Sequence, residues 1–386
     1  MSHSGIMENH ISRKTLDTLI QATNIDSLAF EEIERTFLEE KGIDKFKPDG
    51  RSQVDPRTGD RIIFNSARAS RPHDNRPGEI EENPALAEQE CVICAGKTTG
   101  ILDIADLSEG FTFINKNLFP ILYPSGESKE YPADNGNQLL GPSGLEANGL
   151  HFLQWTSNYH NADWHNMARA DRVIVLQRLA ALEEKLLSSS AGKMPAVSEG
   201  INQNMKHGYV SIIKNYGRLV GGSLAHSHQQ IAFSNTMPRR VGDHVRFVQR
   251  YSETFTAYLL RVNPAGLLIR DYGPAVLLVP YFMRRPYDMF LVLKDTSKSY
   301  VHELDEAELG AVAEGWHDGI LIINQVMVQV DRELAYNVIT NNGPGAGLYF
   351  EFLPYTQETG GMEHLGLYSC QGNPSLMAER IRSILK

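Results

Sequence analysis

Cysteine is scarce in this chain: 386 residues contain three, at positions 91, 94 and 370. Three is the wrong number for the disulfide framework of a small secreted domain, so metal binding or redox work is the better use for the Cys91-x-x-Cys94 pair. Basic residues are also outnumbered, and the formal net charge is -10. Nucleic acid and anionic membranes are therefore not expected as partners, and any phosphate ligand must be held by local groups.

Long apolar runs are missing as well. No run approaches the roughly 20 residues that span a bilayer, and the start MSHSGIMENHISRK has no apolar signal region. Hydrophobic residues make up 41% and charged residues 22%, as in ordinary soluble globular proteins. The composition predicts a cytoplasmic protein, long enough for two domains or one duplicated unit.

The most informative stretch covers residues 210–233, VSIIKNYGRLVGGSLAHSHQQIAF. If its end is a strand, period-2 alternation puts His226, His228 and Gln230 on one face, with roughly 7 Å between each residue and the next. The glycines at 221 and 222, which precede this row, allow a sharp bend with uncovered amide groups, the backbone that close phosphate binding requires.

A neutral imidazole beside a bound phosphate is a competent nucleophile near neutral pH. The His226-Ser227-His228 segment therefore indicates attack on phosphorus by a histidine. Two other interpretations stay open from these residues alone: a pair of metal ligands, or two surface histidines without a role.

The Cys91-x-x-Cys94 turn likewise has three interpretations: half of a zinc site, a redox pair, or chance. A closed tetrahedral site needs two more ligands, and His160 and His165 at a strand-to-helix junction are candidates. The basic loop with Arg68 and Arg71 is either a solvated loop or part of a phosphate site.

Apolar periodicity predicts the main elements. We expect helices over 9–43, 170–187 and 305–330, a helical connection over 238–258, and strands at 61–64, 111–122, 149–157, 290–293 and 337–339. The strand, polar junction and long helix near 152–187 recur near 290–330, which indicates duplication. In the second copy, Tyr349 and Glu351 stand in the row where histidines would be.

With these pieces assembled, the sequence resembles the galactose-1-phosphate uridylyltransferase-like branch of the histidine-triad (HIT) superfamily. The resemblance covers about residues 53–384 and rests on DPRTGDRIIFNSARASRP, CVIC, NKNLFP, TSNYHNADW and, above all, KNYGRLVGGSLAHSHQQI. It implies an α+β fold made of a duplicated HIT-like repeat, an antiparallel sheet with flanking helices. The expected parts are a helical N-terminal extension (1–45), a first repeat with the zinc site and nucleophile (46–245), and a second, degenerate repeat lacking the active-site histidines (246–386).

The resemblance also implies roles for individual residues. His228 matches the nucleophile that becomes a nucleotidyl-histidine, and Gln230 matches the glutamine that hydrogen-bonds the transferring phosphoryl group. Nucleotide and phosphate contacts fall on Arg68, Arg71, Asn117, Asn215, Gly221, Gly222 and Ser223. A structural Zn²⁺ site falls on Cys91, Cys94, His160 and His226, with His165 as the alternative to His160.

The chain departs from the uridylyltransferase pattern at three places. Ser227 replaces a proline between the two histidines, as in nucleoside-diphosphate-sugar phosphorylases and other adenylyl-transferring relatives. Tyr349 and Glu351 replace histidines of an additional metal site, so we expect that metal to be absent. The stretch GGMEHLGLYSC does not reproduce the lysine, tyrosine and glutamate spacing that holds the hexose phosphate.

The leading functional prediction is a ping-pong nucleotidyltransferase of the UDP-glucose:hexose-1-phosphate uridylyltransferase type. Its substrates would be a nucleotide sugar or related nucleotide and a sugar phosphate or phosphate acceptor, and we expect a homodimer. The alternatives are an ADP-sugar or dinucleoside-polyphosphate phosphorylase, a non-catalytic nucleotide-binding protein, and a hydrolase that uses both histidines as catalytic metal ligands.

Overall fold

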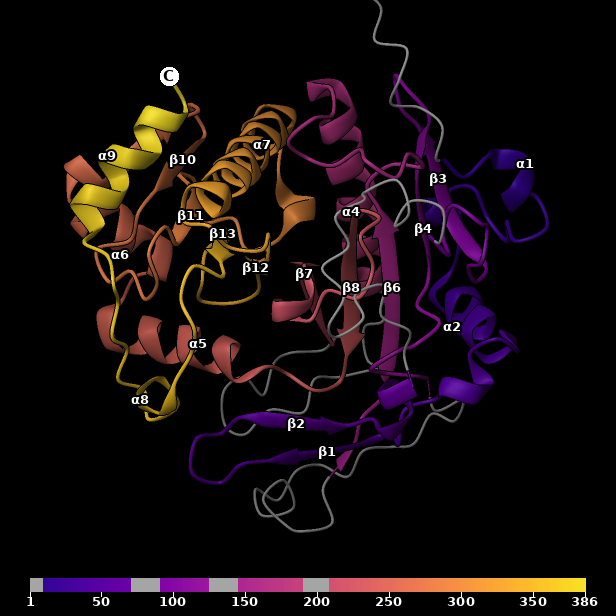
Figure 1. Cartoon of the computed structure of the whole chain (residues 1–386). Helices are drawn as coiled ribbons and strands as arrows, with labels where there is room; N and C mark the ends of the chain where they lie inside the picture. Colours follow the sequence, from indigo (N-terminus) through magenta and orange to yellow (C-terminus); the bar gives the residue numbers. More distant parts are fainter. Residues whose placement is uncertain (1–9, 71–90, 125–144, 190–207) are drawn as a thin grey trace, which may run out of the picture.

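The computed structural model describes residues 10–70, 91–124, 145–189 and 208–386, and its main feature is one continuous sheet (Figure 1). The sheet has ten strands in the order β3-β4-β6-β8-β7-β12-β13-β11-β10-β9, and every neighbouring pair is antiparallel. In that order the strands are Ile101–Asp106, Phe111–Lys116, Gly149–Trp155, His228–Ser234, Tyr209–Tyr216, Tyr336–Asn341, Tyr349–Pro354, Met289–Leu293, Ala275–Leu278 and Leu268–Asp271. The predicted mixed α and β fold with a large antiparallel sheet is confirmed.

The strand order follows the same rule from either edge of the sheet. From the outer edge inward, each half begins with three strands in chain order, β3-β4-β6 or β9-β10-β11. Next comes the last strand of that half, β8 or β13, and then the strand that precedes it in the chain, β7 or β12. In each half a long helix follows the third of these strands along the chain: α4 (Arg169–Ser189) links β6 to β7, and α7 (Glu306–Gln329) links β11 to β12. This order is what a duplicated unit predicts, although the duplication itself stays a prediction.

The core lies on the sheet face that α4 and α7 cover. Ile231 and Phe233 point there from β8, and Phe350 and Phe352 point there from β13, because alternate residues of a strand face opposite sides. Helix α7 approaches closely at Gly319, where a Cβ would lie 2.7 Å from the ring of Phe352. A side chain at this position would therefore collide with the ring. Because the long helices cover one face of the sheet, its opposite face is available for polar side chains.

The N-terminal segment is more closely integrated than the predicted helical extension implied. It forms one helical turn, α1 (Arg13–Leu16), and a short helix, α2 (Phe30–Leu38). The ring of Phe37 packs edge-on against Phe152 of β6, with centroids 5.0 Å apart. The fully buried ammonium of Lys116 on β4 meets Glu40 at 2.9 Å. This segment therefore closes the core at the first half of the sheet.

The helical connection expected over 238–258 is interrupted. Helix α5 (Arg239–Tyr251) ends where Ser252 adopts φ 58°, a left-handed conformation that terminates an α-helix. Helix α6 (Phe255–Val262) then restarts with Thr254 as its cap, whose hydroxyl accepts from the amide of Ala257 at 3.3 Å. The chain ends with α8 (Gly361–His364) and α9 (Pro374–Ile384).

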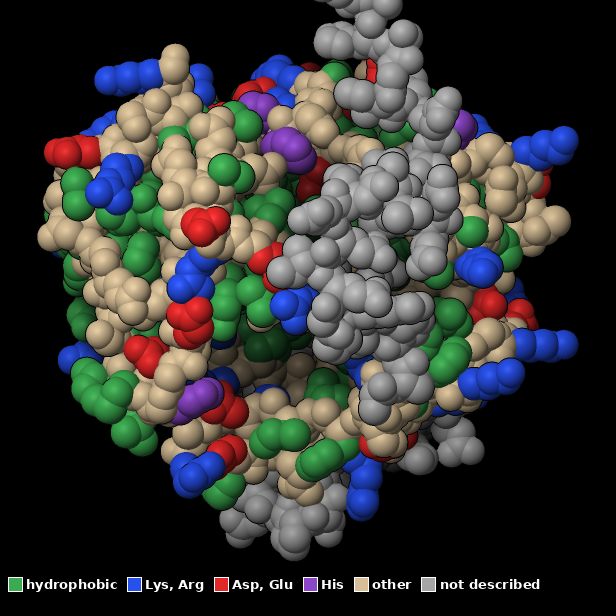
Figure 2. All heavy atoms as spheres, in the orientation of Figure 1, with side chains coloured by type: hydrophobic (Ala, Val, Ile, Leu, Met, Phe, Trp, Pro, Cys, Tyr) green, Lys and Arg blue, Asp and Glu red, His purple; other side chains and the backbone are tan. Residues whose placement is uncertain are grey.

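A second, three-stranded sheet lies beside the main one in the order β2-β1-β5. Its strands are Arg61–Phe64, Arg51–Val54 and Leu145–Glu146. Figure 2 shows acidic and basic side chains interspersed over the face in view, without an extended basic patch among the described residues. No helix in the described ranges has the length and apolar character needed to cross a membrane.

Candidate active site and metal centre

His228 is the first residue of β8 and faces away from the long helices. It pairs in register with Trp155 of β6, and the two rings lie 4.9 Å apart. Its Nδ1 donates to the carbonyl oxygen of His226 at 2.9 Å, which leaves Nε2 as the nitrogen with the free lone pair. Only 5% of His228 is exposed, and this burial lowers the pKa of the imidazole to about 4. The ring is therefore held neutral in one tautomer.

A small cavity of about 80 Å³ lies against His228. It is lined by four of the predicted site residues: His228, Gln230, Ser223 and Asn117. Gln230 stands two residues beyond His228 on the same strand face, as the predicted alternation requires. Asn117 is held by its Oδ1, which accepts from the amide of Phe119 at 2.9 Å. Residues from three separate parts of the sequence thus meet at the predicted nucleophile.

The loop from β7 to β8 depends on glycine. Gly221 adopts φ +86°, a conformation that side chains disfavour. At Gly222 a Cβ would come 2.7 Å from the backbone nitrogen of Gly217, because the loop folds back on itself there. The Gly222 amide donates to the carbonyl of Gly217 at 2.9 Å, so the loop conformation is closed by its own backbone. This bend delivers Ser223 to the cavity.

The other predicted nucleotide contacts lie differently. Gly221 and Gly222 are not among the described lining residues, and their amides, expected to be uncovered, donate to the carbonyls of Arg218 and Gly217. Asn215, on β7, accepts from the side-chain amide of Asn337 at 2.7 Å, and it is not part of the cavity lining within the described chain. The Arg68 guanidinium donates to the carbonyl of Phe119 at 2.7 Å; Phe119 lines the cavity, but Arg68 itself is not among the described lining residues. Arg71 lies outside the described residues.

Cys91, Cys94, His160 and His226 form a cluster whose ligand atoms all lie within 4.8 Å of one another. The Cys94 sulfur lies 3.5 Å from Nδ1 of His160 and 3.5 Å from Nδ1 of His226, and the Cys91 sulfur lies 3.8 Å from Nδ1 of His226. With metal–ligand bonds of about 2.0–2.3 Å, tetrahedral zinc holds its ligands roughly 3.3–3.8 Å apart. The four side chains therefore fit a metal ion of this type.

The surroundings also prepare the cluster for a metal. Nε2 of His226 lies 2.9 Å from the carbonyl of Ser157, a partner that keeps the proton there and turns the Nδ1 lone pair toward the sulfurs. Hydrogen bonding from Cys94, and then from His160 and His226, lowers the pKa of Cys91 to about 2. His160 joins the cluster and His165 does not; His165 lines a different cavity. Such a metal would neutralise the thiolates and anchor His226, two residues before His228.

Metal binding can be tested by replacing Cys94 with serine, which removes the sulfur closest to both histidines. We expect the variant to lose most of the bound metal and to unfold at a lower temperature, because a structural site stabilises the fold directly. Metal content by plasma mass spectrometry and thermal unfolding measure both effects. Cys370→Ser, far from the cluster, is the matched control. Equal metal content in the two variants would exclude this site.

A buried polar network beneath the histidines was not predicted from the sequence. The ammonium of Lys214 donates to the Ser227 hydroxyl at 2.8 Å and lies 3.1 Å from Oδ2 of Asp163. The Ser227 hydroxyl also lies 2.8 Å from that of Thr156 on the neighbouring strand segment. The network ties the residue between His226 and His228 to two other chain segments. The sequence feature that could have indicated this network is Lys214, a charged residue directly after the apolar run of β7.

The comparisons with known proteins agree with this geometry. No family model matches the chain. ADP-glucose phosphorylase from Arabidopsis thaliana is 23% identical over 314 residues, which cover 78% of this chain and 80% of that protein. Galactose-1-phosphate uridylyltransferase from Saccharomyces cerevisiae is 23% identical over 285 residues, covering 69% and 73% respectively.

Solved structures of the same kinds of protein share the fold. A uridylyltransferase structure matches with a TM-score of 0.63 at 18% identity, covering 87% of this chain and 98% of that one. The crystal structure of an Arabidopsis thaliana ADP-glucose phosphorylase with bound ADP-glucose matches with a TM-score of 0.58 at 18% identity, covering 86% and 98%.

The class of protein predicted from the motifs is thereby confirmed: the chain is galactose-1-phosphate uridylyltransferase-like, in sequence and in fold. Its curated relatives are enzymes, one named a phosphorylase of ADP-glucose and the other a uridylyltransferase of galactose 1-phosphate. The prediction of an enzyme is confirmed at the level of its class, nucleotidyl transfer, by these similarities.

Proposed function

We propose that the protein is a nucleotidyltransferase that works through a nucleotidyl-histidine on His228. The observation that carries this proposal is the fixed imidazole: Nδ1 donates to the carbonyl of His226, and the ring lines a cavity together with Gln230 and Ser223. A neutral nitrogen with a free lone pair, held beside polar groups, is the arrangement that nucleophilic catalysis needs.

The proposed reaction has two displacements. In the first, Nε2 of His228 forms a bond to the α-phosphorus of the nucleotide donor, and the bond from that phosphorus to the leaving phosphate oxygen breaks. The leaving group departs with the bonding electrons, as a sugar phosphate from a nucleotide sugar or as a nucleotide from a dinucleoside polyphosphate. In the second, an acceptor phosphate oxygen forms the new bond to phosphorus and releases His228. Gln230 and Ser223 would hold the phosphoryl oxygens, and Arg68, which is hydrogen-bonded to the lining residue Phe119, is a further candidate.

The leading candidate remains transfer of a uridylyl group between hexose 1-phosphates. A phosphorylase that splits an ADP-sugar or a dinucleoside polyphosphate with inorganic phosphate is the second candidate. It is favoured by Ser227, which stands between the histidines where uridylyltransferases have proline. The longer match to ADP-glucose phosphorylase, 78% of this chain against 69%, points the same way.

The proposal extends to the metal and the architecture. We assign a structural Zn²⁺ to Cys91, Cys94, His160 and His226 because sulfur and imidazole ligands in a closed, four-ligand site favour zinc. We also propose that 46–245 and 246–386 are two HIT-like repeats, the second without the active-site histidines. The mirrored strand order supports this division. The homodimer and the cytoplasmic location stay predictions.

Intact mass spectrometry tests the central step. We expect the purified protein, mixed in turn with UDP-glucose, ADP-glucose and a dinucleoside tetraphosphate, to gain the mass of one nucleoside monophosphate from one of these donors. The adduct identifies the base, and it should be absent from His228→Asn. An adduct that persists in the variant would place the nucleophile elsewhere.

The other classes of function give different results in the same experiment. A nucleotide-binding protein without turnover would bind a donor but form no adduct. A hydrolase with catalytic metal ligands would release products without an adduct and would lose activity with a chelator. Either outcome would overturn the proposed transferase.

A further inference from the structure

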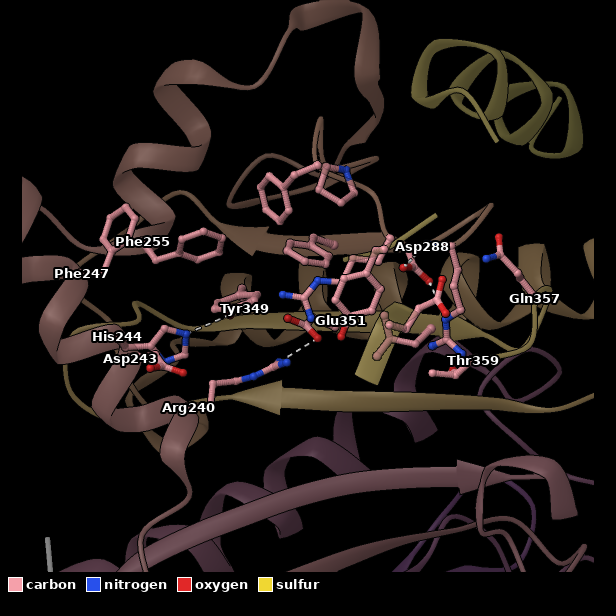
Figure 3. Close-up of a pocket in the computed structure, with 18 of the residues that line it drawn as sticks. Arg240, Asp243, His244, Phe247, Phe255, Asp288, Tyr349, Glu351, Gln357 and Thr359 are labelled. Carbon is pink, nitrogen blue, oxygen red and sulfur yellow. Dashed lines mark hydrogen bonds and ion pairs between the residues drawn. The ribbon is translucent and has the colours of Figure 1, made fainter. Parts of the chain in front are cut away.

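A cavity larger than the one at His228 lies elsewhere in the structure. It has a volume of about 420 Å³ and lies in the second half of the sheet, over β13 and β11 and under helices α5 and α6 (Figure 3). Its wall includes Arg240, His244, Arg284, Asp288, Tyr349 and Glu351. The residues of this cavity belong to none of the predicted catalytic, nucleotide-binding or metal-binding sets.

The strand register relates this cavity to the His228 site. Gln230 pairs with Ile213, Ile213 with Ile339, and Ile339 with Glu351, so one straight row crosses the four central strands. Paired residues point to the same side of a sheet, which puts Gln230 and Glu351 on one face, three strand spacings or roughly 14 Å apart. Tyr349 precedes Glu351 by two residues, as His228 precedes Gln230. The two cavities therefore occupy corresponding places.

The side chains at this second place are fixed by contacts with each other. Figure 3 shows the Arg240 guanidinium meeting the Glu351 carboxylate, a pair 2.8 Å apart, and Nε2 of His244 facing the Tyr349 hydroxyl at 3.0 Å. Burial raises the pKa of Tyr349 well above its usual value, so the phenol stays protonated. A protonated phenol is a poor nucleophile, so Tyr349 does not reproduce the role proposed for His228.

Two buried polar atoms on the wall have no hydrogen-bond partner: Oδ1 of Asp288 and Nδ1 of His244. Asp288 is 3% exposed, and its Oδ1 accepts no hydrogen bond and has only the Nε of Arg285, 3.9 Å away, as an ion-pair partner, which is costly because a buried acceptor normally has a donor. Both atoms belong to residues that line the cavity. A bound molecule with hydroxyl groups could satisfy them.

The charges of the wall leave a cation available. Asp243, another wall residue, lies within ion-pair distance of Arg239 and Arg246, and Glu358 is paired with Arg332. Among the described residues, the Arg284 guanidinium has no carboxylate partner, and the one other wall charge without an ion pair is Glu363, whose carboxylate accepts from the amides of Gly360 and Ser369.

Instead, the Arg284 guanidinium lies 4.8 Å from the ring of Tyr368, which is also on the wall. Phe282, 36% exposed, adds a second ring. A guanidinium without a carboxylate partner, on a wall that also carries two aromatic rings, suits a ligand that has both an anion and a ring.

We propose that this cavity is a second ligand site, which binds a phosphate monoester carried on a hydroxylated ring, the chemistry shared by nucleoside monophosphates and sugar phosphates. Arg284 contacts the phosphate, Phe282 and Tyr368 contact the ring, and Asp288 accepts from a ring hydroxyl. Tyr349 stands where the first site has its proposed nucleophile, so the group that corresponds to His228 is a protonated phenol. The site is thus separate from the proposed transfer reaction.

Isothermal titration calorimetry with AMP, glucose 1-phosphate and inorganic phosphate tests the proposal. We expect AMP or glucose 1-phosphate to bind His228→Asn protein at a site that Arg284→Gln weakens at least tenfold. Arg261→Gln is the matched control, since Arg261 is an exposed arginine on α6 that is paired with Glu253. The ester that binds identifies the ring. Adduct formation on His228 in the Arg284→Gln single variant shows that the chain is folded; if no donor forms an adduct, the unfolding transition serves instead.

Three results would overturn the second site: no ester binding to the His228→Asn protein, equal affinity in Arg284→Gln and the control, or inorganic phosphate binding as tightly as both esters. The last would indicate an unselective anion site. None of these results depends on whether His228 forms an adduct, so the second site and the proposed reaction fail independently.

Discussion

Replacing His228 with asparagine is expected to lower kcat by at least about 10⁴-fold, because loss of the nucleophile removes the covalent route altogether. Asparagine keeps a polar side chain of similar reach, so the contact with Trp155 and the strand pairing are largely retained. Substrate binding should change much less than turnover, since Gln230 and Ser223 remain in the cavity.

Steady-state kinetics with the donor that forms the adduct, together with thermal unfolding, separate these effects. His10→Asn, an exposed histidine near the N-terminus, should keep full activity. A kcat in His228→Asn within tenfold of the unmodified protein would contradict the role of His228. A matching loss of folded protein would instead mean that the residue is structural.

The largest expected effect on stability comes from Lys214. Its ammonium is 1% exposed and faces Asp163, which is 5% exposed. Burial lowers the pKa of Lys214. Burial also opposes ionisation of Asp163, yet the Lys214 charge and the Ser227 hydroxyl hold the pKa of Asp163 below its usual value. Each charge thus depends on the other, and Lys214→Met should destabilise the fold by roughly 3–5 kcal/mol, the cost of leaving a buried charge unpaired.

Chemical denaturation measures this cost, with Lys294→Met as the control. Lys294 forms an ion pair with Asp271 at 2.8 Å, but both side chains are about half exposed, so its loss should cost less than about 1 kcal/mol. The double variant Lys214→Met, Asp163→Asn should recover part of the stability, because no full charge is left buried alone. Equal destabilisation by Lys214→Met and Lys294→Met would contradict the buried network.

The cluster of Cys91, Cys94, His160 and His226 shows which metal ligands a local sequence pattern can predict and which it cannot. Cys91 and Cys94 were visible as half a site because their spacing suits a turn that presents two sulfurs to one ion. The spacing alone did not choose between His160 and His165, which lie five positions apart at the same junction; the resemblance to a known family assigned His160, with His165 as the alternative. Only the folded chain brings Nδ1 of His160 within 3.5 Å of a cysteine sulfur.

Long-range packing was the least predictable feature. Helical periodicity at the N-terminus predicted helices, but periodicity does not specify what an apolar face packs against. The contact of Phe37 with Phe152 joins residues more than a hundred positions apart. The break between α5 and α6 was also missed, since Ser252 shows no strong breaker signal and takes its left-handed conformation in the folded chain.

Local sequence patterns predicted that His228 and Gln230 share a strand face and that a glycine bend precedes them, because strand alternation and backbone freedom at glycine are local properties. His226, predicted for the same row, lies in a bend before β8 begins. Tertiary structure decided which nitrogen of His228 is free, that Lys214 lies beneath Ser227, and that the larger cavity lies over Tyr349 and Glu351. These features depend on strand register and on contacts between distant segments, which no local pattern encodes.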